Sequence, residues 1–179
     1  MGIIAFCLIA LFAHAQRQIP ESDVKAAYLF NFGKFIRVTP PDAVINRQSF
    51  DICLLGEDPI AHTLDELTAN EKLDGKPVRV MRLKAATEAH GCAIAYISPS
   101  EGTRLGTDLD ALRGQAVLTV SDAATFLQHG GMVQFVMVAN HVRFAVNLDA
   151  VRSGQLSLSS ELLRVAISVN GGPGTEVRP

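Results

Sequence analysis

The stretch that most constrains the fold covers residues 116–147, which are largely apolar and carry one acid and one arginine. It begins with a short β-branched run that ends at Asp122, a residue type that favours helix N-caps. We predict two helical turns between Asp122 and Gly130, followed by strands at 133–138 and 142–146. The pattern is that of a strand, a short helix and a hairpin in the middle of a buried sheet.

Short apolar strands alternate with helical segments along the rest of the chain. Further strands are predicted at 50–55, 78–83 and 92–97, and further helices at 21–37, from Pro59 to Leu67, at 98–114, at 148–153 and at 159–169. Strands separated by helical segments of about 10–15 residues form parallel sheets with helices on both faces. We therefore predict an α/β fold: a three-layer sandwich with a mixed, mostly parallel sheet, helices on both faces and a C-terminal antiparallel hairpin.

The first fifteen residues differ in kind from the others. Residues 3–12 form an apolar run that is too short to span a bilayer, and Ala13-His14-Ala15 has the small-x-small pattern of a signal-peptidase site. We predict an export signal over 1–15 that is cleaved after Ala15, a single domain over 16–170 and a flexible tail over 171–179. A buried N-terminal helix or strand is the alternative for the first segment.

Removal of the signal would leave two cysteines, Cys53 and Cys92. An even number of cysteines in an exported chain suggests a disulfide. Two unrelated buried thiols are one alternative. A metal site that combines His90 with Cys92 is another, although no second ligand pair lies at a usual spacing. We predict the disulfide, no metal and no cofactor.

The charge and the motifs exclude several classes of function. A formal net charge of −2 supplies no basic field, so nucleic acid is not predicted as a partner. No glycine-rich phosphate loop is present, and Ser121 lacks the G-x-S-x-G context of a hydrolase nucleophile. The histidines show no pairing with a nucleophile. We predict a protein that is not an enzyme, with a hydrolase as the last of three alternatives.

Acidic residues follow the predicted strands where helices begin, namely Glu57, Asp58, Glu101 and Asp122. Carboxylates suit helix N-termini because they cap backbone N–H groups and interact with the helix dipole. We interpret them as caps. A cation held between them is the alternative, and it would require several oxygens to converge.

Phe30 lies off the face that we expect the first helix to bury, which comprises Val24, Ala27, Tyr28, Phe32, Phe35 and Ile36. It projects with Lys34 and Arg37, its neighbours four and seven residues on. The residue is either covered by a neighbouring loop or exposed between two cations, a composition typical of protein–protein contacts. We predict that Phe30, Lys34 and Arg37 form part of a partner-binding surface.

The chain also resembles the YfiR-type periplasmic proteins. The resemblance is carried by V-K-A-A-Y-L-F-N-F-G-K-F-I at 24–36, F-D-I-C-L-L-G-E-D-P at 50–59, G-K-P-V at 75–78, C-A-I-A-Y-I-S-P-S-E at 92–101, the central stretch, and G-Q-L-S-L-S-S-E-L-L-R-V-A at 154–166. These segments occur in the same order as in the family and cover nearly all of the predicted mature chain.

The resemblance implies a periplasmic repressor, often dimeric, that binds the periplasmic part of an inner-membrane diguanylate cyclase and holds cyclic-di-GMP synthesis down. An OmpA-like outer-membrane lipoprotein can sequester such a repressor. Cys53 and Cys92 match one cysteine pair of the family, and a second pair in the hairpin region is absent. Other members serve sensor kinases or outer-membrane receptors. The alternative function is a periplasmic small-molecule binding module that uses the acidic rim or an apolar pocket under the hairpin.

Overall fold

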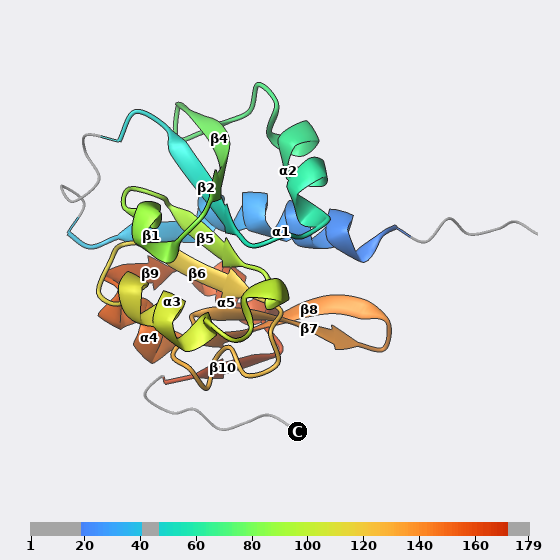
Figure 1. Cartoon of the computed structure of the whole chain (residues 1–179), viewed down its shortest axis with the longest axis vertical. Helices are drawn as coiled ribbons and strands as arrows, with labels where there is room; N and C mark the ends of the chain where they lie inside the picture. The colour runs from blue at the N-terminus through green and yellow to red at the C-terminus, as the bar shows by residue number, and fades with distance from the viewer. Residues whose placement is uncertain (1–18, 41–46, 172–179) are drawn as a thin grey trace, which may run out of the picture.

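An eight-stranded sheet runs through the protein in the order β10-β8-β7-β6-β5-β2-β4-β3 (Figure 1). Its strands are β2 (Phe50–Leu55), β3 (Lys72–Leu73), β4 (Lys76–Leu83), β5 (Ile94–Ile97), β6 (Leu118–Ser121), β7 (Val133–Val138), β8 (His141–Asn147) and β10 (Ser168–Asn170). This computed structural model describes residues 19–40 and 47–171. The predicted export signal and nearly all of the predicted tail lie outside these residues, so the predicted domain boundaries stay predictions.

The sheet is mostly parallel. Strand β2 pairs in parallel with β4 and β5, and β5, β6 and β7 continue the parallel order. Strands β7 and β8 form the antiparallel hairpin, and the short strand β3 pairs antiparallel with β4. A separate two-stranded sheet joins β1 (Ile36–Val38) to β9 (Leu156–Leu158). The prediction of a mixed, mostly parallel sheet with an antiparallel hairpin is confirmed.

Helical segments cover both faces of the sheet, as predicted. They are α1 (Glu21–Phe35), α2 (Ile60–Thr68), α3 (Leu105–Leu112), α4 (Leu148–Ser153) and α5 (Ser160–Val165), with the short 3₁₀ helices η2 (Ala86–Ala89) and η3 (Pro99–Glu101). One hydrophobic core joins the sheet to α1, α2, α4 and α5. A second core, on the opposite face, joins it to η2, α3 and Phe126. Because both faces are covered, all residues of β5 and β6 are buried.

Several local predictions were wrong. The segment after Asp122 forms turns rather than two helical turns, and the Ser121 hydroxyl accepts the backbone N–H of Ala123. The helix predicted over 98–114 is divided into η3 and α3, and Glu101 pairs with Arg104 instead of closing a capping box. The last predicted helix ends at Val165, and β10 follows.

Helix α1 differs from its prediction in the face that it buries. Its buried residues are Lys25, Ala26, Leu29, Phe32 and Gly33, whereas Val24, Tyr28 and Phe35 are only partly buried. The helix packs against α2 as well as against the sheet and α5. Apolar residues therefore surround the helix axis, and their spacing does not identify one buried face.

The predicted Cys53–Cys92 disulfide is present. It joins β2 to the residue two positions before β5, and the two Cα atoms lie 6.1 Å apart. Because the sulfur of Cys92 is bonded to Cys53, it is not available as the thiolate ligand that the His90–Cys92 alternative requires. In the part of the chain that the structure describes, no group of three or more metal-ligating side chains gathers.

Loss of the disulfide is expected to lower the free energy of unfolding. The bond closes a loop with a sequence separation of 39, which corresponds to about 4 kcal/mol when the loop entropy of the unfolded chain alone is considered. We expect a Cys53→Ala, Cys92→Ala variant to lose up to this amount in urea unfolding. A thiol reductant should lower the stability of the wild-type protein and leave the double variant unchanged. Equal stability of the oxidised protein and the double variant would contradict the prediction.

Candidate interaction surface and adjacent cavity

The three residues predicted for partner binding lie close together, and we call them the interaction patch. Phe30 and Lys34 are on α1, whereas Arg37 is on β1, because the helix predicted over 21–37 ends at Phe35. The Lys34 ammonium lies over the Phe30 ring, 4.9 Å from its centroid. The Arg37 guanidinium donates hydrogen bonds to the carbonyl oxygens of Lys34, at 3.2 Å, and Ile36, at 2.7 Å. The patch thus combines one aromatic ring with two cations whose positions are fixed by local contacts.

The local sequence explains this arrangement. Phe30 and Lys34 are one helical turn apart, so their side chains meet on the helix surface. Lys34 also donates a hydrogen bond to the Asn31 side chain at 2.8 Å, and a cation in the last turn interacts favourably with the helix dipole. The backbone becomes extended at Ile36, which turns Arg37 back toward the last helical turn.

The exposure of Phe30 lies between the two predicted alternatives. Its side chain is half-buried, whereas Lys34 and Arg37 are exposed. The Lys34 side chain lies over one face of the ring, so the aromatic group is not fully open. Such a cation–aromatic pair contributes about 0.5–1 kcal/mol at an exposed site and orders both side chains.

The four acids at the starts of the predicted helices form the acidic rim, and two of them, Asp58 and Asp122, are bonded by side chains of the protein itself. The hydroxyl oxygen of Tyr96 lies 2.9 Å from a carboxylate oxygen of Asp58 and 2.9 Å from one of Asp122. Lys25 bonds both Asp122 and Glu21. The cap interpretation holds for Asp58, which accepts the backbone N–H of Ile60 at 3.0 Å.

Burial and neighbouring charges determine the protonation states of Tyr96 and Lys25, which bond the two acids. Burial of Tyr96, together with the negative charges of Asp122 and Asp58, raises the pKa of its hydroxyl, so the tyrosine remains a donor. Burial by itself would lower the pKa of Lys25, but the hydrogen bonds to Asp122 and Glu21 outweigh it and raise that pKa. The sequence analysis did not identify Tyr96 or Lys25. The sequence feature that could have indicated them is a polar side chain within an otherwise apolar segment.

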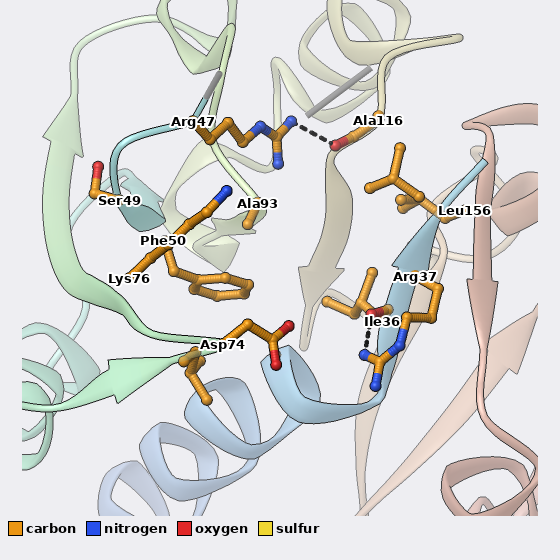
Figure 2. A pocket seen from close by; sticks show the side chains of 13 residues that line it. Ile36, Arg37, Arg47, Ser49, Phe50, Asp74, Lys76, Ala93, Ala116 and Leu156 are labelled. Atoms are coloured by element: carbon orange, nitrogen blue, oxygen red, sulfur yellow. Dashed lines mark hydrogen bonds between the residues drawn. The ribbon is translucent and has the colours of Figure 1, made fainter. Parts of the chain in front are cut away.

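A cavity of about 260 Å³ lies beside the interaction patch, and Arg37 belongs to both (Figure 2). Its lining comes from segments far apart in the sequence: Gly33, Ile36, Arg37, Val38, Arg47, Ser49, Phe50, Leu73, Asp74, Lys76, Ala93, Ala116 and Leu156. The cavity lies at the amino-terminal ends of β2, β5 and β6, the edge opposite the acidic rim. No spacing pattern in the sequence predicted this cavity.

The hairpin also borders a hollow, as the small-molecule alternative expected. A groove of about 1020 Å³ lies between the start of α1 and the β7–β8 hairpin. The hairpin extends beyond the body of the protein (Figure 1). Met137 and Val138, near the hairpin tip, are 51% and 46% exposed, and Ile19 is 72% exposed. The groove is wide and open, so it encloses a small ligand less well than the cavity beside α1.

Among the described residues, no histidine bonds Ser121. Ser121 is fully buried, and its hydroxyl serves the turn that follows it. His129 and His141 each bond a nearby backbone carbonyl, and His62 lies beside Glu66. In the described ranges, 19–40 and 47–171, no helix is both long enough and apolar enough to cross a membrane.

Comparison with known proteins gives one family. The family model described as YfiR/HmsC-like matches residues 22–167. No curated protein matches the sequence.

Asp51, which lies near the cavity, is expected to stabilise the fold in a pH-dependent way. A bidentate bond from Arg79, at 2.8 and 2.7 Å, lowers the pKa of the Asp51 carboxyl below its usual 3.8. Because the pKa of Asp51 is lower in the folded state, its contribution is complete above about pH 4 and is lost as the pH falls through the folded-state pKa. We expect Asp51→Asn to destabilise the protein at pH 7 and to destabilise it less as the pH falls below about 4.

Denaturant unfolding of wild type and variant at several pH values measures this difference. Asp110→Asn is the matched control, because the Asp110–Arg113 pair is exposed on both sides and should contribute little. A destabilisation by Asp51→Asn that is the same at pH 2 and pH 7 would show that the carboxylate charge is not its source.

Proposed function

Because the chain belongs to the YfiR/HmsC-like family, we propose that it is a non-catalytic periplasmic repressor that binds an inner-membrane signalling protein. Proteins of this family are periplasmic regulators of the cyclic-di-GMP system. The target that we propose is the periplasmic part of a diguanylate cyclase, whose output the repressor lowers by direct contact. A sensor kinase or an outer-membrane receptor is the alternative partner.

The observation that carries this proposal is the ordered interaction patch on a family member. Phe30 offers an apolar ring, and Lys34 and Arg37 offer two exposed cations, so the complementary surface would be an apolar contact bordered by carboxylates. Local bonds already fix the three side chains, which lowers the entropy cost of binding. The disulfide supports a periplasmic location, since such bonds persist in oxidising compartments.

Two further parts of the proposal concern assembly. A homodimer is proposed as the state of the free repressor, and an OmpA-like outer-membrane lipoprotein as the protein that sequesters it. Both follow from the family rather than from a particular surface of this chain.

The interaction patch is tested by partner binding. We expect Phe30→Ala with Lys34→Glu to weaken binding to the purified periplasmic domain of the partner by about ten-fold or more, because the change removes a central aromatic and reverses one charge. Lys84→Glu makes the same charge change at an exposed site next to η2 and should leave the affinity unchanged. Unchanged binding of the double variant would remove the patch from the proposal.

The cyclase target is tested in the cell. Deletion of the gene should raise cyclic-di-GMP, and the wild-type gene should restore the lower level. A Cys53→Ser variant that does not restore it would connect repression to the disulfide, provided that the variant accumulates to the same amount. No change in cyclic-di-GMP after deletion would contradict the cyclase as target and favour a kinase or receptor.

A further inference from the structure

We propose that the cavity beside α1 binds a small organic carboxylate with a short apolar body. The cavity is bounded by α1, β1, the β3–β4 turn and the amino-terminal ends of β2, β5 and β6 (Figure 2). Its volume of about 260 Å³ is slightly below the range of about 300–1000 Å³ that is usual for drug-sized ligands. The ligand is therefore small. The proposal does not depend on which signalling protein the chain binds.

The walls of the cavity are apolar. Ile36, Leu73 and Leu156 are buried side chains of the lining, and Phe50 adds a half-buried ring. The α1 backbone comes close to two of these side chains at Gly33, where a Cβ atom would lie 2.6 Å from Leu73 and 2.7 Å from Phe50. These walls suit a hydrocarbon body and offer few groups that could bond a sugar or a base.

The charges of the lining favour an anion. Arg37 and Arg47 contribute two cations, and Asp74 is the one carboxylate among the described lining residues. Figure 2 shows Arg37 and Arg47 on two sides of the hollow. The surplus of positive charge suits a single negative charge, and Asp74 would repel a more highly charged phosphate.

Arg47 is the residue that we expect to bind the carboxylate. One of its guanidinium nitrogens donates to the carbonyl oxygen of Ala116 at 3.1 Å. The nearby acid, Asp51, already accepts hydrogen bonds from two guanidinium nitrogens of Arg79. Burial lowers the pKa of Arg47, and the charge of Asp51 counteracts this effect. A partly desolvated guanidinium gains more than an exposed one from a carboxylate that bonds it through two oxygens.

The test is calorimetric titration of the purified full chain with hexanoate. Hexan-1-ol has the same apolar body without the charge, and inorganic phosphate has the charge without the body. We expect hexanoate to bind, hexan-1-ol to bind about ten-fold or more weaker, and phosphate to neither bind nor compete. Equal binding of hexanoate and hexan-1-ol, competition by phosphate, or no binding of hexanoate at millimolar concentrations would overturn the proposal.

Two variants and a control connect binding to the cavity. Arg47→Met keeps the length of the side chain and removes the charge, and it should weaken hexanoate binding about ten-fold or more. Ala116→Leu fills the hollow without a change of charge and should abolish binding. Lys84→Met removes a cation at an exposed site outside the lining and should leave the affinity unchanged. With all variants shown to be folded by thermal unfolding, unchanged binding by Arg47→Met would overturn the assignment.

Discussion

The burial of β5 on both faces is the constraint on which much of the structure depends. All four residues of the strand are buried, so the hydroxyl of Tyr96 cannot reach water and must find its partners inside the protein. Asp58 and Asp122, from the ends of the two neighbouring strands, lie within hydrogen-bonding distance of it. The hydroxyl has one hydrogen to share between two acids, and Lys25 of α1 compensates the charge of Asp122. One buried tyrosine thereby connects three strands to α1.

This connection determines where the far end of α1 lies. The ion pair between Lys25 and Asp122 holds the first half of the helix at the carboxyl-terminal ends of the strands. The Phe32 ring packs against the rings of Phe135 and Phe144 in the hairpin, at centroid distances of 5.9 and 5.1 Å. The last turn is therefore held on the sheet by contacts on the opposite side from the interaction patch. Cationic and aromatic side chains at that end can be exposed to a partner without being needed to hold the helix in place.

The layers of the fold could be predicted from the sequence, because short apolar strands alternate with helices, and the cysteine pair could be predicted from its even count. The buried face of α1 could not, since α2 and the sheet both cover the helix and its apolar residues follow no single stripe. Strands β1 and β9 have three residues each and exist through pairing with each other, which a local pattern does not contain. The Phe30–Lys34 contact followed from helical spacing, whereas Arg37 lies on β1 and Arg47 bonds Ala116 across 69 residues.

The carboxyl-terminal and amino-terminal ends of the parallel strands differ in what occupies them, and the difference has a physical reason. Ligands of doubly wound folds usually bind at the carboxyl-terminal ends of the strands. Here the side chains of Tyr96, Asp58, Asp122 and Lys25 bond one another at that position. At the amino-terminal ends of the strands a cavity of about 260 Å³ is present, and Gly33 allows the α1 backbone to approach its Phe50 wall closely. Ala93, which lines the cavity, is fixed by its neighbours. It follows the disulfide-bonded Cys92, and the backbone N–H of Ala93 donates to the Asp51 carbonyl oxygen at 2.8 Å. Because this part of the lining is ordered before a ligand arrives, the disulfide reduces the entropy cost of binding at a site that it does not itself line.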